Sequence, residues 1–398
     1  MFDKGNRFFL KNTTVLRRVY LDNAATTTIA GEVIAEMVQT MQTVCGNPSS
    51  SHQYGRTAKT IVENARKSIA KHLNVAASEL IFTSGGTEAN NLILRNAVVN
   101  LGVTHVVTSK IEHAAVLNPL KELATDYGIQ ISYVDMDSKG LLDYAHLRSL
   151  LSNTGHKTLV SLMAVNNEIG SLLSLQKTAN ICHEYKALFH SDAVQAIGHF
   201  NMDLQRACVD FITASAHKFH GPKGIGFAYF KKGVGIKPLL YGGSQEKGAR
   251  AGTEAVHLIR GMQVALDISL KGLTTEIQKM QARKSFFIQE LKTLSPSIAF
   301  NGCSSDVQAS SATILNVRLP LDSPFLLFQL DLKGIAVSGG SACQSGSNGG
   351  SHVLRTLLTA DEAQKTSLRF SFSKHTTNEE LLYVVDVLKE LIFKEVSN

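Results

Sequence analysis

Hydrophobic positions along the chain alternate between short β-rich runs and segments with helical spacing. Strands are predicted at 79–83, 104–108, 131–134, 159–165, 188–190, 211–213 and 225–230. Helical patterns separate most of these strands, and in 31–44 the apolar residues recur three and four positions apart. Strands that alternate with helices are typical of an α/β domain built around a largely parallel sheet.

The pattern changes after about residue 261. A long helical segment of mixed charge covers 266–294, and further helices are predicted at 325–332 and 378–394. Short strands are predicted near 313–317, 335–337 and 368–372. This order of elements indicates a smaller α+β domain. We therefore expect a large α/β domain at 19–262, and a small domain at 263–398 that also includes the N-terminal segment 1–23.

Composition narrows the class of protein. The 398 residues are 44% hydrophobic and 18% charged, as in ordinary globular proteins with room for two domains. The net charge of +7 is spread along the chain without a Lys/Arg block, so nucleic-acid binding is not expected. No apolar run approaches the roughly 20 residues that span a bilayer, so no membrane association is expected either.

The five cysteines are scattered and form no CxxC pair. This pattern argues against a disulfide framework and against a zinc site, so no metal is expected. It favours a reducing compartment, and we expect a cytoplasmic protein. The first 18 residues lack an apolar core long enough for a secretory signal and read as a short extension before the fold.

Candidate chemistry lies where the predicted strands end. The stretch 212–226 reads ITASAHKFHGPKGIG, and its lysine, Lys218, follows a strand at once. A lysine held and partly desolvated on such an edge has a lowered pKa and can form a Schiff base. Gly85 and Gly86 form a turn that opens a helix, where free N–H groups favour an anion. Polar side chains follow other strands at His113, Asn167, Asp192, Gln195 and Ser215.

A Gly/Ser-rich stretch at 338–351 carries one cysteine, Cys343. Ten of the fourteen residues are Gly or Ser, so this stretch cannot bury a core and is expected to be mobile and exposed. Free cysteines are usually buried, which makes a thiol at the centre of such a loop unusual as a packing residue. We interpret Cys343 as a nucleophile on a swinging segment.

Together, these motifs resemble the class V branch of the aspartate-aminotransferase-like fold, whose members depend on pyridoxal phosphate (PLP). More narrowly, they are similar to cysteine desulfurases of the NifS/IscS type. The matching stretches are YLDNAATT, GNPSSSH, FTSGGTEANN, TSKIEHAAVL, VNNEIG, HSDAVQ, SAHKFHGPKGIG, GGSQEKGARAGT, VSGGSACQSGS, SHVLR and SLRFSF. They follow the family's order from Tyr20 to the last predicted helix.

The resemblance implies a role for each matching residue. Lys218 would hold PLP covalently and move protons, Asp192 would pair with the pyridinium nitrogen, and His113 would stack on the ring. The remaining cofactor contacts are implied at Gly86, Thr87, Asn167, Gln195, Ser215, His217 and, from a second subunit, Thr253. Substrate contacts are implied at Arg369, Asn167 and Asn23.

The resemblance also implies a reaction and partners. L-cysteine would lose its sulfur to Cys343, which leaves L-alanine and a persulfide, and the sulfur would pass to an acceptor such as an iron–sulfur scaffold protein. A homodimer is expected. Two alternatives stay open: another class V PLP enzyme, such as a selenocysteine lyase or an aminotransferase, and a non-catalytic scaffold with the PLP fold. An aminotransferase has no use for the Cys343 thiol, and a scaffold needs neither Lys218 nor Asp192.

Overall fold

The computed structural model describes residues 17–152, 155–340 and 350–395. A seven-stranded sheet of order β2-β8-β7-β6-β5-β3-β4 forms its centre. The strands are β2 (Leu80–Thr83), β3 (His105–Thr108), β4 (Gln130–Tyr133), β5 (Thr158–Ser161), β6 (Leu188–Asp192), β7 (Phe211–Ser215) and β8 (Gly226–Phe230). Only β8 runs antiparallel to its neighbours within this sheet. The predicted α/β fold with a mostly parallel sheet is confirmed.

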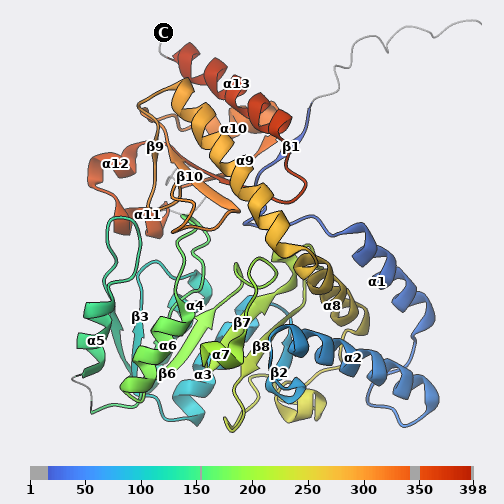
Figure 1. The fold of residues 1–398 in the computed structure, drawn as a ribbon. Coiled ribbons are helices and arrows are strands. Elements are labelled where there is room, and N and C mark those ends of the chain that lie inside the picture. Colours follow the sequence, from blue (N-terminus) through green and yellow to red (C-terminus); the bar gives the residue numbers. More distant parts are fainter. Residues whose placement is uncertain (1–16, 153–154, 341–349, 396–398) are drawn as a thin grey trace, which may run out of the picture.

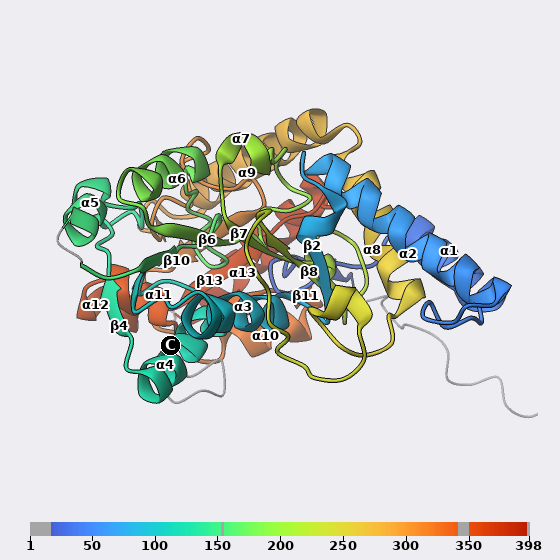
Figure 2. The same cartoon turned by 90° about the horizontal axis from the view of Figure 1, so that it is seen from below.

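Helices cover both faces of this sheet (Figure 2). Successive residues of β8 point to opposite faces, so Phe227 and Tyr229 join one buried cluster while Ala228 and Phe230 join the other. One face packs against α3 (Gly86–Arg95) and α4 (Ala114–Tyr127). The other face packs against α1 (Gly31–Thr43), α2 (Gln53–His72), α5 (Tyr144–Ser152), α6 (Leu175–Glu184), α7 (Leu204–Ala207) and α8 (Val256–Leu270).

A second, four-stranded antiparallel sheet lies beyond the carboxyl ends of the large sheet (Figure 1). Its order is β12-β13-β10-β9, with β9 (Ala299–Phe300), β10 (Ile314–Arg318), β12 (Ser338–Gly339) and β13 (Ser367–Ser371). The helices α9 (Leu273–Leu294), α10 (Leu326–Leu332), α11 (His352–Leu357), α12 (Ala360–Gln364) and α13 (Asn378–Glu395) belong to this part of the chain. The N-terminal β1 (Val19–Tyr20) pairs with β11 (Ile335–Ala336), and Val19 and Leu21 join the buried cluster of α9 and α13.

Two predicted elements differ from the structure. The helix predicted over 266–294 is broken, because Lys271 and Gly272 separate α8 from α9 and Gly272 has a φ of +70°. The strand predicted over 159–165 ends at Ser161, and only an isolated bridge at Val165 follows. Both predicted elements are too long because the apolar pattern of the sequence continues past the point where the chain changes direction. The predicted domain limits at 262 and 263 stay a prediction.

Among the described residues, no helix combines the length and the apolarity that crossing a bilayer requires.

Candidate active site

The ends of the large sheet's strands enclose a cavity of about 430 Å³. Ten of the residues predicted for the site line it: Gly86, Thr87, His113, Asn167, Asp192, Gln195, Ser215, His217, Lys218 and Arg369. They come from turns after β2, β3, β5, β6 and β7 and, across the gap, from β13. Polar groups of a parallel sheet gather at the carboxyl ends of its strands, which is why separate motifs converge here.

Lys218 ends a single turn of 3₁₀ helix (Ala216–Lys218) that continues directly from β7. Its Nζ donates to the carbonyl oxygens of Ala24 at 2.5 Å and Ala25 at 2.8 Å. Burial, followed by the charge of Arg369, lowers the pKa of Lys218 to about 8. A fraction of this amine is therefore neutral near pH 7.5, and a neutral amine can act as a nucleophile or as a base.

The turn at Gly85 and Gly86 forms a cradle for an anion. Gly85 has a φ of +151°, and a Cβ at Gly86 would lie 2.7 Å from Val194 Cγ2. Only glycine therefore allows the start of α3 to come this close to the loop after β6. No side chain caps α3, and its first residues, Gly86 and Thr87, line the cavity together with Ser215. Such a helix start attracts phosphate or carboxylate groups.

Asp192 ends β6 at the base of the cavity, where it is 6% exposed. Its carboxylate accepts hydrogen bonds from Asn90 Nδ2 at 2.7 Å and from the backbone N–H of Val194 at 3.0 Å. Gln195 Nε2 donates to the carbonyl oxygen of Ala24 at 2.9 Å. These bonds hold a carboxylate and an amide at fixed positions on the same wall.

Two imidazoles also line the cavity. His113 caps α4, and its Nδ1 accepts from the N–H of Ala115 at 3.0 Å. Burial lowers the pKa of His113, and burial together with the charge of Lys218 lowers the pKa of His217 to about 4. Both rings are therefore neutral at pH 7, so each can donate from one nitrogen and accept at the other.

Arg369 lies on β13, opposite the cradle. One Nη donates to the carbonyl oxygen of Asn167 at 3.0 Å, and the other donates to Asp22 Oδ1 and to Ser338 Oγ, each at 2.9 Å. Its buried Nε has no hydrogen-bond partner in the structure. The guanidinium is thus held in one orientation at the wall of the cavity.

Three predicted site residues are not among these ten. Cys343 falls outside the described residues. Asn23 lines a neighbouring cavity, and its amide donates to the carbonyl oxygen of Ser371 at 2.8 Å. Thr253 is exposed and does not line this cavity, so its contact with a second subunit stays a prediction.

The described residues that flank Cys343 border the site. Ser338 pairs in register with Arg369 and donates to Asp22 Oδ1 at 2.7 Å. On the other side, Ser351 Oγ donates to Glu168 Oε2 at 2.5 Å, next to Asn167. Both ends of this segment are therefore fixed beside the cavity.

Sequence reasoning missed Asn90, Asp22 and Glu112. Asn90 lies four residues after Gly86, which places both on one face of α3, so helical spacing could have identified it. Glu112 is 1% exposed; burial, with a contribution from Asp192, raises its pKa to about 8. Ser109 Oγ donates to Glu112 Oε1 at 2.7 Å, and Oε2 has no partner. No sequence signal marks this carboxyl as protonated, because its pKa depends on burial in the fold.

The donor set of the cavity fits PLP. The α3 cradle, Thr87, Ser215 and His217 would hold its phosphate, and the cradle would not form if Gly86 carried a Cβ. Asp192 would face the ring nitrogen, and the Lys218 amine would bind the aldehyde. An amine with a lowered pKa and a fixed carboxylate in one pocket are what this cofactor requires.

Comparisons with known proteins agree with this geometry. The family model described as aminotransferase class-V matches residues 19–384. A curated cysteine desulfurase IscS of Dictyoglomus turgidum is 40% identical over 380 residues, which cover 95% of each chain. A solved NifS-like protein superposes with a TM-score of 0.87 at 34% identity and covers 94% of this chain and 99% of its own. A structure described as SspA in complex with cysteine gives a TM-score of 0.77 at 28% identity, over 90% of this chain and 99% of that one.

Proposed function

Because the chain belongs to the class V aminotransferase family, in its cysteine desulfurase group, we propose that it is a PLP-dependent enzyme that removes sulfur from L-cysteine. The products are L-alanine and a persulfide on Cys343. One observation carries the proposal: the Lys218 amine, with its lowered pKa, lies in a cavity bordered by both flanks of the Cys343 segment.

When bound, PLP supplies an electron sink that weakens bonds at the α-carbon of the substrate. Lys218 would anchor the cofactor and afterwards move a proton to and from the substrate, because its pKa of about 8 leaves it able to do both near neutral pH. Asp192 would keep the ring nitrogen protonated, Gln195 would donate to the phenolic oxygen, and Asn167 would lie near that oxygen. His113 would cover its face.

Arg369, which lines the cavity, would bind the carboxylate of L-cysteine through its guanidinium group. Its contacts with Asn167, Asp22 and Ser338 keep the group oriented, so binding costs little side-chain ordering. The Cys343 thiolate would then take the substrate sulfur. The bond from that sulfur to the β-carbon breaks as a new sulfur–sulfur bond forms, and the electron pair left on the substrate is taken up as the β-carbon gains a proton to give L-alanine.

Partners and location complete the proposal. Thr253 would contact the phosphate from a second subunit, which makes the active form a homodimer. The persulfide would be transferred in the cytoplasm to an acceptor protein, such as an iron–sulfur scaffold. The curated relatives carry the name IscS, which supports this type of acceptor.

The test measures the two products together. The wild-type enzyme, given PLP and L-cysteine, is expected to release alanine and to gain the mass of one sulfur atom on the peptide that contains Cys343. Cys343→Ala is expected to keep the visible PLP absorbance and to lose the added sulfur, with sulfide release down by at least about 100-fold. Cys45→Ala, which changes an exposed thiol elsewhere, is the matched control. Undiminished sulfide release by Cys343→Ala would support another class V activity instead.

A further inference from the structure

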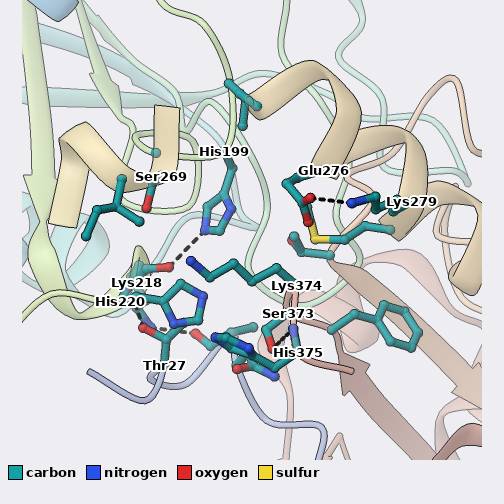
Figure 3. A pocket seen from close by; sticks show the side chains of 18 of the residues that line it. Thr27, His199, Lys218, His220, Ser269, Glu276, Lys279, Ser373, Lys374 and His375 are labelled. Atoms are coloured by element: carbon teal, nitrogen blue, oxygen red, sulfur yellow. Dashed lines mark hydrogen bonds and ion pairs between the residues drawn. The ribbon is translucent and has the colours of Figure 1, made fainter. Parts of the chain in front are cut away.

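A second cavity, also of about 430 Å³, lies on the other side of Lys218 (Figure 3). It is lined by the loops after β6 and β7, by the start of α9, and by the turn after β13. His199 marks its junction with the first cavity, since its Nε2 donates to the backbone carbonyl of Lys218 at 2.8 Å. Asn23, Gln195 and Lys218 of the predicted site also line this cavity, but its other lining residues have no role in the proposed desulfurase reaction.

Positive charge predominates around this cavity. Besides Lys218, four cations line it, Lys271, Lys279, Arg283 and Lys374, against a single carboxylate, Glu276. Glu276 is already paired with Lys279 at 2.8 Å. Within the described ranges, Lys271, Arg283 and Lys374 form no ion pair, so their charges are available to a ligand.

The start of α9 adds to this field. Leu273, its first residue, lines the cavity, and no side chain caps the helix at Gly272. The unpaired N–H groups at the beginning of a 22-residue helix carry a partial positive charge. The lysines, the arginine and the helix end therefore all favour an anion in the same space.

Two of the imidazoles that line the cavity each use one ring nitrogen to donate within the protein, which leaves the other nitrogen as an acceptor for a ligand. His199 donates through Nε2 to Lys218, and His220 donates through Nδ1 to the carbonyl of Thr28 at 2.9 Å. Burial lowers the pKa of His199 and lowers that of His220 to about 4, so each ring is neutral at pH 7. The second nitrogen of each ring has no proton and can accept a hydrogen bond from a hydroxyl group. Lys374 extends toward both rings (Figure 3).

We propose that this cavity binds a small metabolite that carries two or more negative charges and at least one hydroxyl group. The acidic groups would face Lys374, Arg283 and the start of α9, and a hydroxyl would donate to His199 or His220. A hydroxy-polycarboxylate and a sugar phosphate share this chemistry. The ligand would bind next to the backbone that carries Lys218 without entering the cavity where PLP is expected.

The experiment is isothermal titration calorimetry on the PLP-loaded protein, without cysteine, at constant ionic strength. The probes are citrate and ribose 5-phosphate. Each has a matched partner without alcohol hydroxyl groups: tricarballylate for citrate and inorganic phosphate for ribose 5-phosphate. We expect one of the hydroxylated probes to bind with one site per chain, and its partner to bind at least about threefold more weakly. Binding of citrate would identify the ligand as a hydroxy-polycarboxylate, and binding of ribose 5-phosphate would identify it as a sugar phosphate.

Variants locate the site. Lys374→Met and Arg283→Met are each expected to weaken binding about tenfold, since each removes one partly buried charge. Lys389→Met, an exposed charge on α13, is the matched control and should leave binding unchanged. Arg369→Met, which removes a cation of the first cavity, should also leave binding unchanged.

The proposal is overturned if neither hydroxylated probe binds, or if Lys374→Met and Lys389→Met weaken binding equally. It is also overturned if Arg369→Met abolishes binding, because the probe would then occupy the first cavity. Binding is measured without substrate, so a failure of the desulfurase assignment would not alter these outcomes.

Discussion

Two lysines in this molecule have similarly lowered pKa values, yet they lie in different surroundings. Burial lowers the pKa of both Lys218 and Lys284 to about 8. Lys284, on α9, is 0% exposed, and its Nζ donates to Ser310 Oγ and to the carbonyl oxygen of Ser311, each at 2.8 Å. Lys218 lines a cavity that also contains Asp192 and Arg369.

The comparison shows that a lowered pKa alone does not indicate a reactive amine. Desolvation acts equally on a lysine in a packed core and on one at the wall of a pocket. Lys218 differs from Lys284 because it lines a cavity that can hold a ligand and that is surrounded by fixed polar groups. Lys284 has two oxygen acceptors and lines none of the cavities described above, so a structural role accounts for it.

The largest expected effect is on enzyme activity, when Lys218 and Lys284 are replaced one at a time. Lys218→Ala should reduce cysteine-dependent sulfide release by about 1000-fold or more, because it removes the anchor of the cofactor and the base together. Lys284→Met should keep activity within about threefold. Sulfide release and visible absorbance are measured for both variants under saturating PLP. Equal losses of activity in the two variants would contradict the distinction drawn here.

The next effect is the pH dependence of stability contributed by Lys284. The unfolded amine has a pKa of about 10.4, so between pH 8 and that value the unfolded chain binds the proton that the folded chain has lost. Stability should therefore rise with pH across this range, by about 3 kcal/mol in total. Lys284→Met should remove this rise.

Urea unfolding at several pH values between 7 and 10.5 measures the contribution of Lys284. The quantity compared is the free energy of unfolding of the parent protein minus that of Lys284→Met. Both are made in a Cys303→Ala background, because Cys303 is near Lys284 and burial raises its pKa to about 11. A difference that is flat with pH would mean that Lys284 is not desolvated.

A smaller effect is expected at Arg369, whose charge contributes to the low pKa of Lys218. Arg369→Lys keeps the charge but cannot make the same set of planar contacts with Asn167, Asp22 and Ser338. We expect KM for L-cysteine to rise about tenfold, with a smaller change in kcat. Arg318→Lys, in the same sheet but paired with Glu362, is the matched control. If both variants raise KM alike, Arg369 does not bind the substrate.

Much of the first cavity could be predicted because its residues follow strands. Lys218, Asp192 and Ser215 lie at or directly after strand ends, and the topology of a parallel sheet brings such residues together. The second cavity could not be predicted in this way. Its cations come from Lys271, from the first half of α9 and from the turn after β13, about 90 residues later, so they meet only in the folded chain. The apolar periodicity also continues through Lys271 and Gly272, which hides the start of α9.

The smallest effect concerns the hydrogen bonds of Lys284 rather than its charge. Ser310 Oγ accepts from Lys284 Nζ and donates to the carbonyl oxygens of Asp306 at 2.6 Å and Ser304 at 3.2 Å. Ser310→Ala removes all three bonds and should lower the free energy of unfolding by about 1–2 kcal/mol at pH 7. Above pH 9 the amine is mostly neutral, so its bond weakens and the loss should shrink toward that of the two carbonyl bonds alone. Ser285→Ala, at an exposed position of α9, is the control and should change stability by less than about 0.5 kcal/mol. A loss that is the same at pH 7 and pH 10 would show that the hydroxyl serves the fold of the loop and not the ammonium group.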